Sequence, residues 1–473
     1  MTEKVVNNTF ISLGKTFWPL YLLGGFQSLA YGGIIVLIVP LSSLFWSGEP
    51  YHALEMGILI TSMVWMSAIS GIIIGILIDK YSRKYIMFII SIFRGFSMIM
   101  LGFAIEGKGL ETWTYFLIFT GIFAFFAGGS WPAIISLSND IVPHPQRSQF
   151  FGLLGIMMSL FTQFGFLVAS FLVQYEFWRS FFWGVGVSIL VAGIIFLFQI
   201  EEPKRGAQQQ ELNEILNDDS IKYDFHIDKK IMKKTMLSRT NVVALIEGIS
   251  TNLFLGSLDL LILPYIQTPP HNISPIFTGL FLVIFGLTGG LIGQLFLAKL
   301  SDKLAMKKPI RRIYFVIFSL SLGITTFSYL FFLDLPHLTV EQGKDIPYIL
   351  SLPIMWIMGL LFFTSNSISS LYLVNQAPVL QEINLPEAQG KIASWNQLLE
   401  SIGYGAGPLL VGILLSISGQ NYQLVILIII IFVIPGIVLW FLSLKWYPKD
   451  RDIIKSLLKE RAEILKSQKN LKN

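Results

Sequence analysis

Twelve long apolar segments, separated by short polar stretches, constrain this sequence more than any other feature. A helix rises 1.5 Å per residue, so about 20 apolar residues cross a hydrocarbon core that is ~30 Å thick. The segments lie at roughly 17–44, 55–78, 84–105, 112–140, 147–174, 178–200, 239–266, 275–299, 309–332, 347–376, 387–417 and 420–445. An isolated strand would leave its backbone unpaired in lipid. The sequence therefore predicts an all-α membrane protein with twelve transmembrane helices.

The scarcity of charge supports a lipid environment. Charged residues make up 13% of the chain, against about 25% in soluble domains. The chain has no cysteine, which excludes disulfides, zinc–cysteine sites and thiol catalysis. The stretch "MTEKVVNNTFISLGK" lacks a short apolar core followed by a cleavage site, so the first apolar segment is expected to remain in the mature protein.

The lysines and arginines predict the orientation. If the N-terminus is cytoplasmic, the inner segments hold 30 of the 34 basic residues. The outer loops hold Lys108, Arg179 and Lys344, and Arg94 lies inside a span. This bias obeys the positive-inside rule. It predicts a multi-pass protein of the cell membrane with both termini in the cytoplasm.

One long polar interruption divides the chain. We expect an N-terminal six-helix bundle at 1–200, a cytoplasmic central loop at 201–238, a C-terminal six-helix bundle at 239–446 and a cytoplasmic tail at 447–473. The loop is either a solvated linker or, in its second part, a short basic helix on the anionic inner leaflet. The tail has the pattern of an amphipathic helix, with partner binding as a further reading.

A charged motif recurs in the two halves. Gly75-x-x-x-Asp79-Lys80-x-x-Arg83-Lys84 follows the second segment, and Ala298-x-x-x-Asp302-Lys303 follows the eighth. The two aspartates are 223 residues apart, which is about half the chain. This spacing indicates two copies of a six-helix unit.

At these residues the sequence resembles the major facilitator superfamily, whose signature is G-x-x-x-D-(R/K)-x-G-(R/K)-(R/K). It departs from the signature at Ser82, where the family usually has glycine. The resemblance implies two pseudo-symmetric six-helix bundles and secondary transport by alternating access. The stretches "EFWRSFFWGVG" and "EEPKRG" also look like Spinster-type transporters, which move lysolipids and related amphiphiles. The first and fourth segments depart from that subfamily.

The resemblance also implies a gating latch. Asp79 would meet the N-terminus of the helix at 387–417, where a helix dipole favours an acid. Arg83 would reach Asp140. The alternative is that the bases Lys80, Arg83 and Lys84 only obey the positive-inside rule. In the second copy, with Asp302 and Lys303, the latch is expected to be weaker, because Ala298 replaces the glycine and Gln376 takes the place of Asp140.

Ionisable residues inside spans are candidates for function, because lipid makes them costly. They are Arg94, Glu247, Asp259 and Glu400. Glu400 follows Asn396 by one turn. Desolvation favours the neutral form of a carboxyl group, so this acid could exchange a proton near neutral pH. A structural acid at a packed interface is the alternative. Gly403 and Gly407, four residues apart, predict close helix packing.

Other polar residues complete the candidate site. Glu247 is a proton or substrate candidate in a segment that lines the central cavity in the family. Asp259, which shares a helix face with Asn252, is either an outer gate or a solvated acid. Arg94 is expected to snorkel or to pair with an acid that the sequence does not identify, with contact to the substrate as a further reading. The remaining candidates are Gln27, Tyr31, Trp131, Gln163 and Asn366.

No enzyme motif is present: there is no phosphate-binding G-x-x-x-x-G-K-[ST], no H-E-x-x-H and no G-x-S-x-G. We therefore expect no enzyme activity, no cofactor, no metal and no nucleic-acid partner. The predicted function is secondary active transport of a small organic or lipid-like amphiphilic solute, coupled to a proton or another ion, by a monomer acting as symporter or antiporter. The alternative is a non-transporting receptor or scaffold with the same fold.

Overall fold

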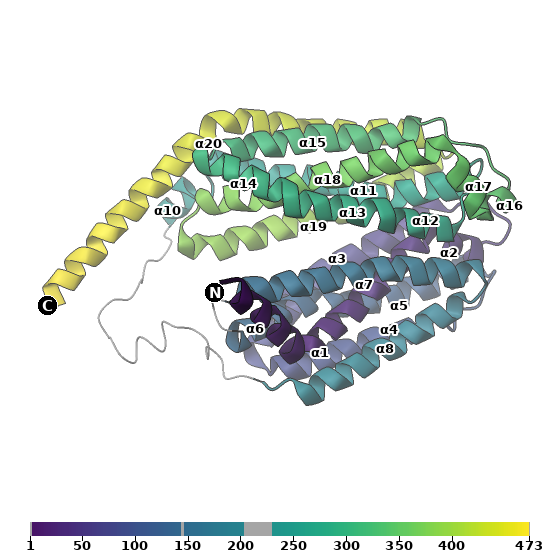
Figure 1. Ribbon diagram of the computed structural model, residues 1–473, viewed down its shortest axis with the longest axis horizontal. Coiled ribbons are helices and arrows are strands. Elements are labelled where there is room, and N and C mark those ends of the chain that lie inside the picture. The colour runs from purple at the N-terminus through teal and green to yellow at the C-terminus, as the bar shows by residue number, and fades with distance from the viewer. Residues whose placement is uncertain (1, 143–145, 203–228, 473) are drawn as a thin grey trace. The chain divides into compact units, whose positions relative to one another are not determined.

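The computed structural model describes residues 2–142, 146–202 and 229–472. Within these ranges it leaves undescribed the side chains of 2–11, 79, 139–140, 148, 230, 386–387, 390, 462 and 464–472. The described chain is helical, without a strand (Figure 1). Twelve of its segments are long and apolar enough to cross a membrane, which confirms the predicted number of spans.

The first compact unit comprises residues 1–216, 266–283 and 338–344. Its helices are α1 Thr2–Val36, α2 Ile38–Phe45, α3 Ala53–Lys80, α4 Arg83–Leu101, α5 Leu110–Gly128, α6 Ser130–Ile141, α7 Arg147–Gln174, α8 Trp178–Gln199, α12 Pro275–Phe281 and α16 Val340–Lys344. Helix α1 packs along α7, α4 along α8, and α3 along α5. Helix α12, at the start of the eighth span, belongs to this unit because it packs on α7.

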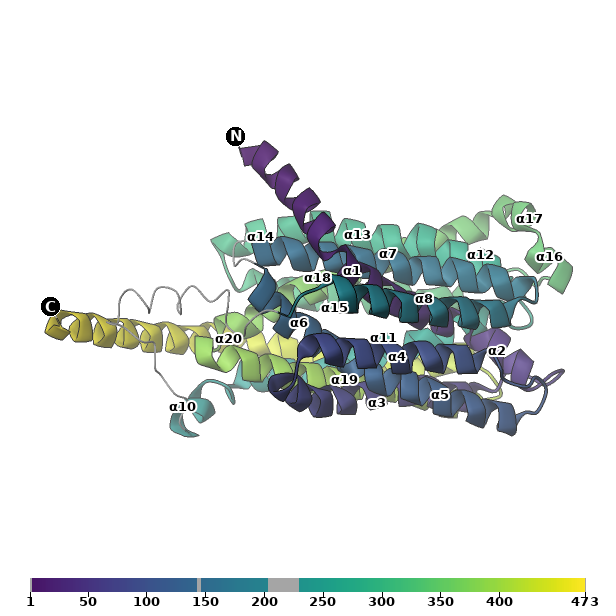
Figure 2. The same ribbon diagram turned by 90° about the horizontal axis from the view of Figure 1, so that it is seen from below.

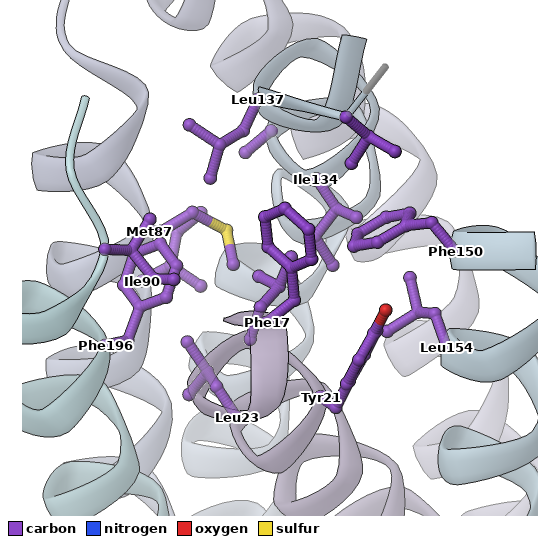
Figure 3. Packing of buried hydrophobic residues seen from close by; sticks show 14 of the residues in the cluster. Phe17, Tyr21, Leu23, Met87, Ile90, Ile134, Leu137, Phe150, Leu154 and Phe196 are labelled. Carbon is purple, nitrogen blue, oxygen red and sulfur yellow. The ribbon is translucent and has the colours of Figure 1, made fainter. Parts of the chain in front are cut away.

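Large apolar side chains fill one end of this unit (Figure 3). The ten residues labelled in the figure come from five helices: Phe17, Tyr21 and Leu23 of α1, Met87 and Ile90 of α4, Ile134 and Leu137 of α6, Phe150 and Leu154 of α7, and Phe196 of α8. The rings of Phe17 and Phe150 meet edge to face with centroids 5.2 Å apart. This arrangement is favoured by the ring quadrupoles, so it fixes α1 against α7.

Glycines allow the two helices to approach closely. A Cβ atom at Gly32 of α1 would lie 2.5 Å from the carbonyl oxygen of Thr162, and one at Gly165 of α7 would lie 2.3 Å from that of Leu29. Neither contact is sterically tolerable, so both positions require glycine for this packing.

The fourth span is interrupted at Gly129, between α5 and α6. The sequence pair Trp131-Pro132 follows directly. Proline lacks the N–H that would bond to the carbonyl of residue 128, so the regular helix is weakened there. The interruption places Ser130 at the first turn of α6, beside α4.

The second compact unit comprises residues 217–265, 284–337 and 345–473. Its elements are α10 Lys229–Lys234, α11 Arg239–Gln267, a π-helical turn Leu282–Leu287, α13 Thr288–Ile292, a second π-helical turn Gly293–Leu297, α14 Ala298–Lys307, α15 Arg311–Tyr329 with a 3-10 turn Leu330–Phe332, α17 Ile346–Ser351, α18 Pro353–Glu382, α19 Pro386–Ile417 and α20 Tyr422–Lys472. The bounds of α11 and of the first π-helical turn pass slightly beyond this unit.

Several helices extend beyond the bounds of the predicted spans. Helix α18 ends at Glu382, six residues beyond the predicted bound, and the preceding residues 346–351 form the separate helix α17. Helix α20 runs from the last span through the predicted tail without a break, beyond the ends of α14 and α19 (Figures 1 and 2). The tail is thus a continuation of the last transmembrane helix.

A small apolar cluster holds this continuation in place. Ile454 of α20 packs with Met236, Leu385 and Ala388. The carboxylate of Asp450 also accepts a hydrogen bond from the N–H of Thr240, at 3.0 Å, in the first turn of α11. An acid at a helix N-terminus is stabilising. Helix α10 is the short basic helix of the predicted central loop; residues 203–228 of that loop lie outside the described part of the chain.

Candidate functional site

Glu247, about two turns inside α11, is completely buried in the second unit. Thr251, one turn later, donates a hydrogen bond to its Oε1, and the hydroxyl of Tyr372 on α18 donates to its Oε2 at 3.0 Å. A Cβ atom at Gly436 of α20 would lie 3.1 Å from its Cγ. Three helices therefore enclose this carboxyl group, and its hydrogen-bond partners within the described structure are neutral.

Glu400, in the middle of α19, has a similar environment. Its Oε1 accepts hydrogen bonds from Asn396 at 2.7 Å and from Gln376 of α18 at 3.2 Å. The predicted neighbour Asn396 is thus a direct partner. Gln376, expected only to mark a weak latch, instead contacts this acid.

One helix joins the two acids. Tyr372, which bonds Glu247, and Gln376, which bonds Glu400, are one turn apart on α18 and so share a face. Gly248 lies next to Glu247, and a Cβ atom there would be 3.3 Å from Cγ of Glu400. The side chain of Glu400 therefore lies against the turn of α11 that carries Glu247. We call Glu247, Glu400, Asn396, Tyr372 and Gln376 the acid pair cluster.

The close packing of α11 against α19 brings these acids together. A Cβ atom at Gly403 would lie 2.2 Å from the carbonyl oxygen of Ile249, and one at Gly407 would lie 2.4 Å from that of Leu253. The glycine spacing on α19 predicted this close packing, and the structure confirms it. Side chains at these positions would push α19 away and separate Glu400 from α11.

Asp259 lies three turns beyond Glu247 on α11 and accepts a 2.6 Å hydrogen bond from the hydroxyl of Tyr404 on α19. Asn252 and Asn366 donate to carbonyls of their own helices, those of Gly248 and Phe362. These three candidates therefore lie outside the acid pair cluster.

In the first unit, Arg94 of α4 lies among α1, α5 and α6. Its Nη1 donates to Oε1 of Gln27 at 2.7 Å and to the hydroxyl of Ser130 at 3.4 Å, and its Nη2 donates to the carbonyl of Gln27 at 3.3 Å. Its guanidinium carbon lies 4.3 Å from the ring centroid of Phe123. The expectation that Arg94 pairs with an acid is not met among the described residues. We call Arg94, Gln27, Ser130 and Phe123 the arginine cluster.

The remaining mid-span candidates are less closely placed. Tyr31 is half-buried, one turn beyond Gln27 on α1. Gln163 of α7 has a buried Oε1 without a hydrogen-bond partner in the described chain. Trp131 is exposed in the structure, and its ring lies 6.1 Å from that of Phe151. No hydrogen bond between these residues and Arg94 is present among the described atoms.

At the N-terminus of α4, the carboxylate of Glu202 binds the first turn of the helix. It accepts hydrogen bonds from the backbone N–H groups of Arg83 at 3.2 Å and Lys84 at 2.7 Å, and from the hydroxyl of Ser82 at 2.8 Å. Nε of Arg83 lies 2.9 Å from the same carboxylate, and its Nη1 donates to the carbonyl of Ser136. The serine that replaces the family's glycine thus has a specific partner.

The pKa of Glu202 lies below its usual value. Burial raises the pKa, but the hydrogen bonds from the backbone of Lys84, the side chain of Arg83 and the hydroxyl of Ser82 lower it by more. Such donors favour the charged form of a carboxyl group. Glu202 therefore stays ionised as a counter-ion at the end of α4.

The second unit has a corresponding group around Arg312 in the first turn of α15. Arg312 lies 2.9 Å from Asp302 of α14 and 3.6 Å from Glu382, the last residue of α18. Glu382 also pairs with Arg451 of α20 at 3.1 Å and accepts a hydrogen bond from Tyr447. The second copy of the motif thus uses Arg312 and Glu382, which sequence reasoning missed.

The other predicted latch residues are placed as follows. The side chains of Asp79 and Asp140 lie outside the described part of the structure, although their backbones belong to α3 and α6. Lys80 and Lys303 are exposed, and a Cβ atom at Gly75 would meet nothing within 4 Å. The predicted contacts of Asp79 with α19 and of Arg83 with Asp140 remain predictions.

The chain matches the family model described as "Major Facilitator Superfamily" over residues 20–380. Two relatives, both named "Probable sugar efflux transporter", come from Helicobacter pylori strains HPAG1 and ATCC 700392/26695. They are 25% and 24% identical to the chain over 391 residues, which cover 82% of this chain and 85% of each relative.

Solved structures resemble the fold. One is a bacterial homologue of the human lysosomal transporter Spinster in an inward-facing, occupied conformation, with 16% identity, a TM-score of 0.68, and coverage of 93% of this chain and 98% of that one. Another is a D-xylose-proton symporter, with 12% identity, a TM-score of 0.64, and coverage of 90% and 97%. At these identities, the likeness shows the fold alone.

Proposed function

The chain belongs to the Major Facilitator Superfamily and is a multi-pass membrane transporter rather than an enzyme, and from this premise we propose that it couples the movement of a small polar organic solute to protons. The observation that carries this proposal is the acid pair cluster: two neighbouring mid-helix carboxyl groups whose described partners are all neutral.

The cost of buried charge supports the coupling to protons. A carboxylate in a low-dielectric interior needs an opposite charge or a proton. No lysine, arginine or histidine pairs with Glu247 or Glu400 among the described residues. Two carboxylates near each other also repel, so one of them readily holds a proton. Binding and release of this proton would change the hydrogen bonds of Tyr372 and Gln376, and hence the contacts of α18 with α11 and α19.

A sugar-like solute is supported by the names of the two relatives. Their names also favour export. The amphiphile predicted from the Spinster-type resemblance has only the fold likeness behind it, because that structure is 16% identical. We therefore propose a polyhydroxylated solute and treat lysolipids as the competing class.

For gating, we propose that the helix-end groups around Arg83 and Arg312 hold one conformation, with Asp79 acting at the end of α3. The distribution of bases supports a cytoplasmic position for this end and for both termini. Asp79→Asn should then slow turnover and leave solute binding intact. If the protein is a scaffold, there is no transport for this substitution to slow.

The test of proton coupling uses purified protein in liposomes. A pH gradient should drive accumulation of radiolabelled D-glucose or D-xylose. Glu247→Gln and Glu400→Gln should each abolish gradient-driven accumulation and still permit counterflow exchange, which needs no net proton movement. Glu111→Gln, a control at an exposed acid in the first turn of α5, should behave as wild type.

Other outcomes would be equally clear. If both glutamine variants accumulate solute as wild type does, the acids are structural and the coupling proposal is wrong. Transport of lysophosphatidylcholine without transport of any sugar would replace the proposed solute class. Absence of exchange for every compound by well-folded protein would favour the scaffold reading.

A further inference from the structure

We propose that the arginine cluster binds an acidic group of the transported solute, either a carboxylate or a phosphate. This inference rests on the proposed function, because it concerns the solute of the same transporter. It deepens that function by narrowing a polar, sugar-like solute to a sugar acid or a sugar phosphate.

The first argument is the charge of Arg94. The residue is 5% exposed, near the middle of α4, and no carboxylate pairs with it among the described residues. Four other arginines have ion pairs in the described structure: Arg83 with Glu202, Arg179 with Glu106, Arg312 with Asp302, and Arg451 with Glu382. A buried guanidinium cannot lose its proton to escape the cost of burial, so it requires an anion.

The second argument is the set of unused donors. Nε of Arg94 and Nε2 of Gln27 are both buried, and neither has a hydrogen-bond partner in the described structure. Gln27 is 4% exposed. Both groups donate and cannot accept. A carboxylate or phosphate accepts from several donors at once and supplies the missing charge, whereas a sugar hydroxyl would satisfy a donor and leave the charge unbalanced.

The third argument is that the donors are held in advance. Oε1 and the backbone carbonyl of Gln27 fix two nitrogens of Arg94, and Phe123 lies under the guanidinium plane. Ser130 adds a contact from the first turn of α6. A site whose side chains are already fixed loses little entropy when a ligand binds. Arg94, Gln27 and Ser130 lie on three different helices, so a bound anion would also influence how these helices pack together.

The experiment compares three sugars that differ in one group. Wild-type protein in nanodiscs of neutral phosphatidylcholine is titrated with D-glucose, D-glucuronate and D-glucose 6-phosphate, and binding is measured by calorimetry and by the shift in Tm. At least one acid should bind about tenfold tighter than glucose, as expected for charge-assisted hydrogen bonds. Arg94→Gln should remove this preference, and Arg94→Lys should retain part of it.

The control is Arg179→Gln. Arg179 also lies over an aromatic ring, that of Trp178 at 4.5 Å, but it pairs with a carboxylate. Its loss should leave the preference for acids unchanged. If Arg94→Gln does not fold, Gln27→Leu provides a second test, because it removes the free Nε2 donor and should weaken binding of the acids more than binding of glucose.

Equal binding of all three sugars, no binding of either acid, or a preference that survives Arg94→Gln would overturn the proposal. So would an Arg94-dependent stabilisation by phosphatidylglycerol in the absence of any response to the sugar acids, since the anion would then be a lipid headgroup. Equilibrium binding needs no pH gradient. A failure here is therefore distinct from a failure of proton coupling, which the glutamine variants of the acid pair test.

Discussion

Two arginines at helix ends, Arg83 and Arg312, have partners of opposite charge, whereas the charged residues of the two clusters inside the spans have neutral partners among the described residues. Arg83 pairs with Glu202, and Arg312 pairs with Asp302 and Glu382. Arg94, by contrast, bonds to an amide, a backbone carbonyl and a hydroxyl. Glu247 and Glu400 of the acid pair cluster bond to hydroxyl and amide groups.

The difference indicates two purposes. A charge with a permanent partner of opposite sign is neutralised within the protein, and it can hold helix ends together. A mid-helix charge with neutral partners is neutralised only by something that binds, such as a proton or a ligand. The helix ends would therefore supply stability and gating, and the helix centres would supply coupling and recognition. Four predictions test this distinction, from the largest expected effect to the smallest.

Arg312→Met should lower stability by about 1–3 kcal/mol, because it leaves Asp302 without its base and weakens the group around Glu382. The measurement is thermal unfolding in detergent. Lys303→Met is the matched control, since Lys303 is an exposed base next to Asp302 on α14. An unchanged Tm for Arg312→Met would mean that the helix-end pairs do not stabilise the fold.

The double substitution Arg94→Met with Gln27→Met should leave stability unchanged or raise it by about 1 kcal/mol. It replaces a buried charge and its amide partner with apolar groups of similar size. The same thermal assay measures it. A loss of more than about 2 kcal/mol would show that the arginine cluster is a structural clamp, and the distinction between ends and centres would then fail for this residue.

Glu202→Gln should lower stability by about 1 kcal/mol or less, because the carboxylate is partly exposed. The pKa of Glu202 is lower in the folded protein than in the unfolded chain. Its contribution is therefore present above the unfolded pKa of about 4.3 and is lost as the pH falls through the folded pKa. The Tm difference between wild type and variant should be constant from neutral pH to about pH 5 and shrink below about pH 4. A difference that grows on acidification would contradict this assignment.

Ser82→Gly should have the smallest effect, a few tenths of a kcal/mol, because glycine is also acceptable before the first turn of a helix. The variant restores the residue usual in the family and removes the hydroxyl bond to Glu202. Ser82→Ala should cost more, about 1 kcal/mol. If both variants are as stable as the wild type, the hydroxyl and the cap contribute nothing at this helix end.

The site was only half visible in the sequence. Glu247, Glu400 and Arg94 stand out because each charge interrupts an apolar run. The partners Tyr372 and Gln376 do not stand out, because they are neutral and lie on another helix, 125 and 24 residues away from the acids they contact. Glu202 was missed at the end of α4 for a related reason: it lies 119 residues from Arg83, in a stretch that composition alone marks as a linker.

The sequence by itself determined the twelve spans and their approximate bounds, because the thickness of a bilayer sets the length of each apolar run. It also predicted that another helix packs closely on α19, because two glycines four residues apart leave room for a close approach, but only the structure identified that helix as α11. Only the tertiary structure decided which charges have partners and which do not. Pairing depends on the rotation and depth of helices far apart in the chain, and a hydropathy pattern contains neither.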